Sequence, residues 1–187
     1  LHEGPVPDAS RTELRRVRAR FLGECGWGSE RSLLDAFERR DRLYEHALDA
    51  GTEIVLWFEH DLYDQLQLLQ VLAWAREGVA LIQADDHIGP LHADELEALW
   101  PRRVPVTAEM LALAREAWDA FRAPDPTALA RLLERDTDAL PHLEAAVRRL
   151  LEELPDAGTG LSRTERQLLE PLADGPRRPG ELFVESQ

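Results

Sequence analysis

The sequence has little cysteine and lacks lysine and asparagine altogether. Cys25 is the only cysteine among 187 residues, and all 22 basic residues are arginine. A single cysteine excludes an intramolecular disulfide and favours a reducing compartment, so we expect a cytoplasmic protein. No apolar run approaches the roughly 20 residues that cross a bilayer, and the N-terminus lacks the basic-then-apolar pattern of a signal peptide. We therefore expect no membrane partner.

Common signatures of nucleotide-binding and hydrolytic enzymes are also missing. The sequence contains no Walker loop, no Gly-x-Gly-x-x-Gly fingerprint, no Gly-x-Ser-x-Gly elbow and no His-Glu-x-x-His pair. Any chemistry must therefore be sought in less specific patterns of residues.

Negative charge gathers in the middle of the chain. The whole sequence carries a net charge of −14, and residues 51–100 contain one arginine against ten carboxylates. Residues 151–187 are also acidic, with four arginines against eight carboxylates. An acidic surface repels phosphate backbones, so binding of nucleic acid through residues 51–100 is disfavoured. Cations, or no charged partner at all, suit this region better.

Residues 53–84 have the pattern of a strand–helix–strand unit. The apolar run at 54–58 has no polar alternation, which predicts a strand buried on both faces of a parallel sheet. Leucines then recur at helical spacing from Leu62 to Leu72, and residues 79–82 form a second apolar run. The predicted fold class is therefore α/β, with a small, partly parallel, Rossmann-like sheet. Because two strands are too few for a stable sheet, we expect a further strand upstream of Leu1.

The rest of the chain is predicted to be helical. Helical patterns cover 10–22 and 29–50 before the first strand, and 94–100, 107–122, 126–135 and 139–154 after the second. A linker rich in proline and glycine at 155–160 precedes a capping box from Ser162 to Glu165. We therefore predict three parts: an N-terminally truncated α/β domain (1–92), an all-α region packed on it (93–155) and a C-terminal module (156–187). Four tryptophans fall in apolar patterns and are expected in the core: Trp57, Trp74, Trp100 and Trp118.

Acidic and histidine side chains follow both predicted strands. In open α/β sheets ligands bind beyond the carboxyl ends of the strands, so both groups should emerge at one edge. Carboxylates and imidazoles there can hold a divalent cation or form an acid/base pair. After the first strand, the candidate catalytic residues are Glu59, Asp61 and Asp64. The candidate ligand-binding residues are His60, Gln65 and, from an N-terminal turn, Glu3 and Gly4. Asp85, Asp86 and His87 follow the second strand.

A purely structural interpretation of these residues stays open. Asp61 stands where the cap of the following helix belongs, and Asp64 falls in its first turn, where carboxylates satisfy free backbone N–H groups. Asp85 and Asp86 are typical turn residues, and His87 is expected to be solvated.

Three stretches resemble a bacterial family called domain of unknown function 1835. They are residues 1–7 (Leu-His-Glu-Gly-Pro-Val-Pro), 56–66 (Leu-Trp-Phe-Glu-His-Asp-Leu-Tyr-Asp-Gln-Leu) and 160–167 (Gly-Leu-Ser-Arg-Thr-Glu-Arg-Gln). The resemblance implies a strand and a Gly-Asp turn upstream of Leu1, and a small winged-helix-like tail that begins in residues 156–187. It supplies no activity. Residues 84–92 depart from the glycine-rich stretch of the family, which makes Asp85, Asp86 and His87 weaker candidates than Glu59 and its neighbours.

Two functions remain open from the sequence. The first is an enzyme or binding domain for a small ligand, nucleotide or metal at the sheet edge, with Glu59 or Asp61 as general base or as ligand of a divalent cation, and Gln65 orienting the substrate. The second is a regulatory or protein-interaction protein without catalysis, whose C-terminal part is a helix-turn-helix-like module. Nucleic acid remains a possible partner only through that tail.

Overall fold

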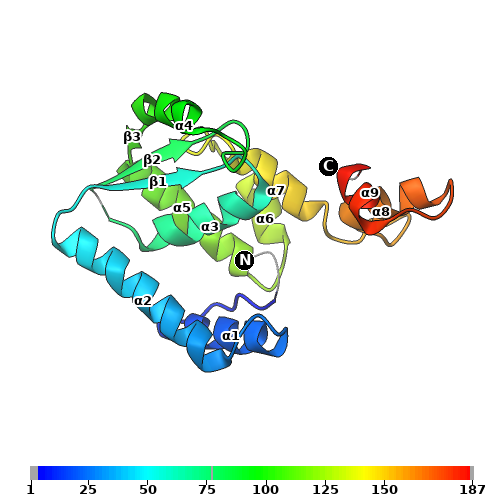
Figure 1. Ribbon diagram of the computed structural model, residues 1–187, viewed down its shortest axis with the longest axis horizontal. Helices are drawn as coiled ribbons and strands as arrows, with labels where there is room; N and C mark the ends of the chain where they lie inside the picture. Colours follow the sequence, from blue (N-terminus) through cyan, green and yellow to red (C-terminus); the bar gives the residue numbers. More distant parts are fainter. Residues whose placement is uncertain (1–3, 77, 186–187) are drawn as a thin grey trace.

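The computed structural model describes residues 4–76 and 78–185 as a mixed α/β protein that is mostly helical (Figure 1). Its strands are β1 (Ile54–Phe58), β2 (Val79–Gln83) and β3 (Val104–Pro105). Its helices are α1 (Arg11–Glu24), α2 (Glu30–Asp49), α3 (Leu62–Trp74), α4 (Ala93–Leu99), α5 (Ala108–Arg122), α6 (Thr127–Leu132), α7 (Leu143–Leu151), α8 (Arg163–Leu172) and α9 (Pro179–Glu185), with a 3-10 turn, η1 (Trp100–Arg102).

The strand–helix–strand unit predicted over 53–84 is present. β1 and β2 pair in parallel with Leu56 opposite Leu81, and α3 connects them. The sheet order is β1-β2-β3, and β3 is antiparallel to β2. The prediction of an all-α region after residue 93 was therefore wrong at Val104 and Pro105. Two residues are too few for a recognisable strand pattern, and proline is tolerated in a strand that lies at the edge of a sheet.

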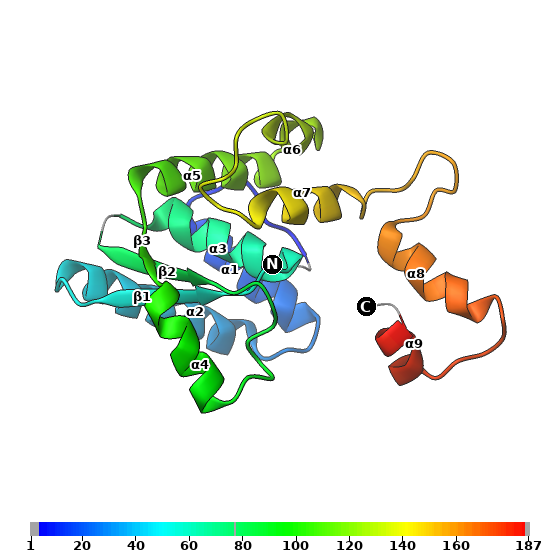
Figure 2. The ribbon, with the colours of Figure 1, turned by 90° about the horizontal axis from the view of Figure 1, so that it is seen from above.

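Helices cover the sheet on both sides (Figure 2). α3, α5 and α7 lie on one face, while α4 lies on the other. A continuous cluster of buried apolar side chains extends from Leu14 of α1 to Val147 of α7 and includes Leu72, Leu81 and Trp118. Helices before and after the β1–α3–β2 unit therefore share one core with it, and the predicted division into three parts stays a prediction.

The strand β1 is less buried than its sequence suggested. All five of its residues are only partly buried, because it lies at an edge of the sheet. Trp57 stacks on Trp100 at a centroid distance of 6.3 Å, and Trp100 itself is 40% exposed. The prediction that Trp100 is a core residue was thus wrong, because its ring packs over Trp57 of β1 and remains partly exposed to solvent.

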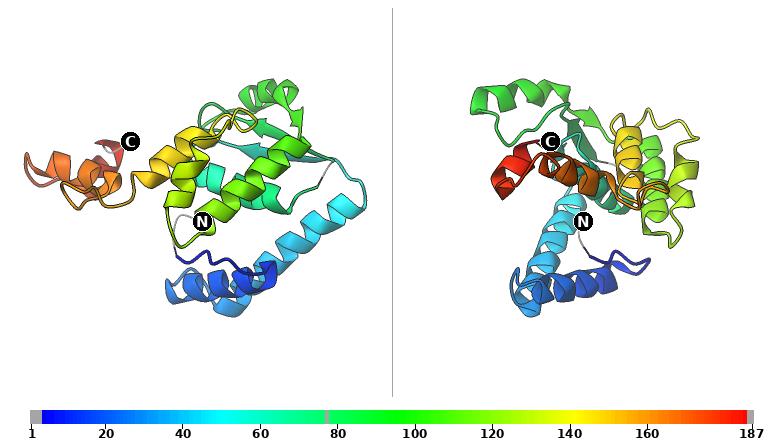
Figure 3. Two further views of the ribbon diagram at one scale, coloured as in Figure 1. Left: turned by 180° about the vertical axis from the view of Figure 1, so that it is seen from behind. Right: turned by 90° about the vertical axis from the view of Figure 1, so that its right-hand side faces the viewer.

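Helices α1 and α2 form a hairpin at the opposite end of the molecule from α4 (Figures 1 and 3). Ser10 begins α1 by accepting the N–H of Glu13, and Ser29 begins α2 by accepting the N–H of Ser32. These contacts satisfy backbone donors that have no partner within the helix.

The helices α8 and α9 stand apart from the rest of the described chain (Figure 3). The capping box between Ser162 and Glu165 is formed, and Pro171 lies inside α8. A hydrogen-bonded junction ties α8 to α7, with the hydroxyl of Thr164 donating to Glu153 and accepting from Arg149. The winged-helix-like character of residues 156–187 stays a prediction.

None of the helices in the described residues combines the length and the apolar character that a bilayer crossing requires.

Candidate functional site

The parallel pairing of β1 and β2 brings the two acidic runs to one edge of the sheet. Phe58 accepts a 2.8 Å hydrogen bond from the N–H of Ala84, so the strands stay paired up to the residues before Glu59 and Asp85. Beyond this pair, the segment after β1 enters α3 and the segment after β2 forms the loop that leads to α4. The candidate site lies where these two segments separate, beyond the carboxyl ends of the strands, as the rule for open α/β sheets predicts.

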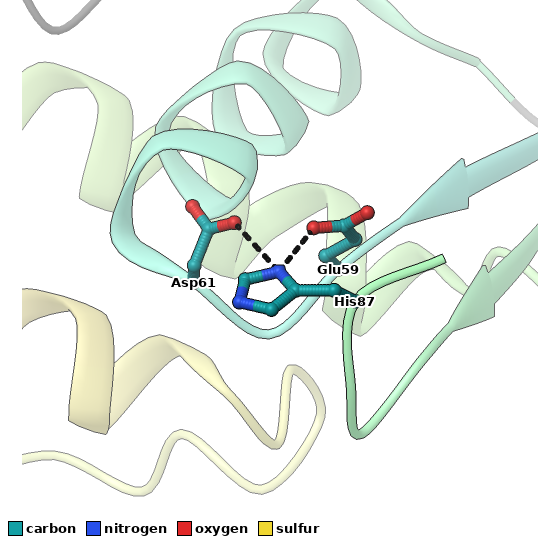
Figure 4. A group of neighbouring side chains, drawn as sticks. All are labelled: Glu59, Asp61 and His87. Carbon is teal, nitrogen blue, oxygen red and sulfur yellow. Dashed lines mark hydrogen bonds and ion pairs between the residues drawn. The ribbon is translucent and has the colours of Figure 1, made fainter. Parts of the chain in front are cut away.

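Glu59 holds the loop after β2. Its Oε2 lies 2.7 Å from Nδ1 of His87 (Figure 4). Its Oε1 accepts the N–H of Ile88 at 2.8 Å. Since a carboxylate only accepts, Nδ1 of His87 carries the proton. His87 was expected to be solvated; its side chain is 53% exposed, yet it is anchored by Glu59.

Asp61 uses its two oxygens differently. Oδ1 accepts the N–H groups of Tyr63 and Asp64 at 2.7 and 3.0 Å, which is the predicted helix cap. Oδ2 lies 4.0 Å from Nδ1 of His87. Capping therefore leaves one oxygen turned toward the histidine. One ligand atom each from Glu59, Asp61 and His87 lie within 4.8 Å of one another.

Asp64 and Gln65 support the main chain of Glu59. Oδ2 of Asp64 accepts the N–H of Glu59 at 2.7 Å, and the amide of Gln65 donates to the Glu59 carbonyl at the same distance. Gln65 is 1% exposed. A side chain so buried and so engaged orients the main chain of Glu59, and the expected role of Gln65 in orienting a substrate stays a prediction. Burial raises the pKa of Asp64.

Glu59 and His87 perturb each other. The hydrogen bond from His87 lowers the pKa of Glu59, and the same bond to the carboxylate raises the pKa of His87. The two groups therefore form an ion pair over a wider pH range than free side chains would.

Two further histidines border this cluster. The ring of His60 lies 5.3 Å from that of His87 and 6.2 Å from that of His142, which precedes α7. Within the described residues, Nδ1 of His60 and Nε2 of His142 are shielded from solvent and make no hydrogen bond. Nε2 of His142 lies 3.5 Å from Asp85, within ion-pair range, and burial lowers the pKa of His142.

Sequence reasoning missed His142 altogether, because His142 lies more than 80 residues from His60 in the chain and carries no motif. Asp85 accepts a 2.6 Å hydrogen bond from Arg102, and Asp86 accepts the N–H of His87, as expected of a turn residue.

Of the two N-terminal candidates, Gly4 lies in the described residues, and no described contact joins it to the cluster. Gly4 has a φ of +75°, and a Cβ added there would lie 2.3 Å from the Phe21 ring of α1. Its lack of a side chain is therefore explained by packing. Glu3 lies outside the described residues.

Comparison with family models, with curated proteins and with solved structures finds no match for this chain. The resemblance to domain of unknown function 1835 therefore stays a prediction.

Proposed function

We propose that the sheet edge binds a divalent cation through Glu59, Asp61 and His87, and that the protein is a metal-dependent enzyme or binding domain for a small ligand. The observation that carries the proposal is the convergence of three ligand atoms from two strand ends within 4.8 Å. Two carboxylates and one imidazole suit a borderline cation such as Zn²⁺ or Mn²⁺, whereas Ca²⁺ takes six to eight oxygen ligands.

Three protein ligands leave coordination positions for a ligand from solution, as in catalytic rather than structural sites. A cation held by Glu59, Asp61 and His87 would attract an anionic group to its open coordination positions. The ligand class that we propose is therefore a small anionic molecule, nucleotides included.

Cation binding must compete with a proton. The hydrogen bond to Glu59 raises the pKa of His87 and so favours the imidazolium, whereas a histidine binds metal only in its neutral form. Below that pKa, binding should thus release a proton and strengthen as the pH rises.

The test is isothermal titration calorimetry of the full chain with Zn²⁺, Mn²⁺ and Mg²⁺. We expect one site that His87→Ala and Glu59→Gln each weaken by at least about tenfold. His46→Ala on α2 and Glu97→Gln on α4 are matched controls, since both side chains are exposed and outside the cluster. Equal affinity of the site variants and the controls would refute the proposal.

Three further predictions from the sequence are also proposed here. We propose a Rossmann-like sheet, a cytoplasmic location and membership of the domain of unknown function 1835 family. The parallel β1–α3–β2 unit supports the first of these, and the single cysteine supports the second.

The alternative is a regulatory or interaction protein that acts through α8 and α9. It is favoured by the apolar side chains of Leu168, Leu169 and Leu172, which α8 leaves exposed. Binding of the full chain to DNA at low salt, compared with a chain that ends at Leu154, tests this alternative. Equal weak binding by both would count against it.

A further inference from the structure

A second recess is formed by residues other than those of the sheet-edge cluster. It is a groove of about 280 Å³ between the α1–α2 hairpin and the adjacent face of α3. Figures 1 and 3 show the hairpin at the end of the molecule opposite α4. None of the residues that line the groove belongs to the cluster of Glu59, Asp61 and His87.

The walls of the groove are mainly apolar and aromatic. They include Leu14 and Leu22 of α1, Phe37 of α2 and Trp74 of α3. Trp27, in the turn between α1 and α2, lies at the groove and is 70% exposed. An aromatic side chain this exposed beside an apolar recess is available to a ligand.

The groove is positively charged in an otherwise acidic protein. Its described lining contains three arginines (Arg15, Arg18 and Arg40) and no carboxylate. Behind the lining, the buried carboxylate of Asp41 accepts from Arg15 at 2.9 Å and from Arg40 at 2.7 Å. Two guanidinium groups thus share one carboxylate, which neutralises only half of their charge.

The guanidinium of Arg15 is also incompletely hydrogen-bonded. Its Nε is shielded from solvent and has no hydrogen-bond partner among the described atoms. A buried donor without an acceptor is unfavourable, and the Arg15 side chain would gain an acceptor by turning toward an anion in the groove.

We propose that this groove binds a small amphipathic anion, with its apolar body between Trp27, Phe37 and Trp74 and its carboxylate or phosphate head on Arg15 and Arg40. Guanidinium groups match both head groups through paired hydrogen bonds. A recess of this size accommodates a small molecule rather than a folded partner.

Tryptophan fluorescence and calorimetry on the full chain test the proposal with three probes of equal chain length: decanoate, decyl phosphate and decanol, each below its micelle concentration. We expect saturable 1:1 binding of at least one anion, at least about tenfold tighter than decanol. The tighter anion identifies the head group. Equal binding of the anions and the alcohol would overturn the proposal.

Two variants localise the binding. Arg40→Gln removes one of the two guanidinium groups on which the head group is placed, so the ratio of the affinity for the anion to the affinity for decanol should fall. Trp27→Ala should weaken all three probes, and it should fold because Trp27 is exposed. Arg42→Gln, an exposed arginine on α2 outside the groove lining, is the control and should change nothing.

Thermal unfolding of each variant reports its fold. An anion preference that persists in Arg40→Gln, or a groove covered by self-association in light scattering, would overturn the proposal.

Discussion

Asp61 performs two roles with two oxygens, and two substitutions separate them. Oδ1 caps α3, while Oδ2 lies 4.0 Å from His87. Asp61→Ala removes both oxygens. Loss of an N-cap costs about 1 kcal/mol and loss of a charge at the helix N-terminus about 0.3–1 kcal/mol, so we expect a destabilisation of about 1–2 kcal/mol. For a chain of this length that lowers the thermal midpoint by roughly 2–8 °C.

Asp61→Asn keeps a capping oxygen and loses the charge. Because asparagine caps as well as aspartate, we expect this variant to lose less than about 1 kcal/mol. Its affinity for the divalent cation should still fall at least about tenfold, as far as in Asp61→Ala, because the anionic ligand is gone from both. Urea unfolding without metal measures the first effect, and calorimetry with Zn²⁺ measures the second.

The two measurements can fail separately. If Asp61→Asn is as unstable as Asp61→Ala, the cap does not contribute as its geometry indicates. If Asp61→Asn binds the cation as the unaltered chain does, Asp61 is only a cap.

Three further predictions concern the surroundings of this site and the C-terminal junction. In EDTA, the ion pair of Glu59 and His87 should stabilise the fold most between about pH 4.5 and 6.5. Because the pKa of His87 is raised in the folded protein, the stability that His87 contributes is lost as the pH rises through that raised pKa. Because the pKa of Glu59 is lowered, the stability that Glu59 contributes is lost as the pH falls through that lowered pKa. Urea unfolding against pH checks this, and His87→Ala should remove the high-pH limb. Gln65→Leu should cost about 1–3 kcal/mol by leaving the Glu59 carbonyl without its donor, with Gln67→Leu, an exposed neighbour, as control. Thr164→Val should speed proteolysis at residues 155–160 and leave the main thermal transition unchanged, because it breaks only the junction between α7 and α8.

Much of the fold follows from local sequence. The caps at Ser10 and Ser162 and the apolar runs of β1 and β2 depend on neighbouring residues, so their patterns are visible without tertiary information. What failed depends on distant contacts. Trp100 has the apolar character of a core residue, but its position over Trp57 at the sheet edge leaves it 40% exposed.

Only the part of the site that follows from the sheet topology could be predicted from the sequence. The parallel sheet rule placed Glu59 and His87 at one edge, but their contact joins residues 28 apart through the conformation of a loop. The departure of residues 84–92 from the family pattern argued against His87 as a site residue, whereas the hydrogen bond that His87 donates to Glu59 supports it. His142 was beyond reach, because its position depends on how α7 packs on α3.

The helix α3 connects the two regions to which we assign binding. Asp61 caps its first turn at the sheet edge, and Trp74, its last residue, lines the groove. Asp61 and Trp74 lie roughly 20 Å apart along this helix, and the groove lining extends along it as far as Gln67. Leu68 and Leu72 of α3 are fully buried, and a close-packed helix has no spare volume in which to shift. The cation and the amphipathic anion should therefore bind independently. If binding of one changed the affinity for the other, α3 would have to shift as a rigid body.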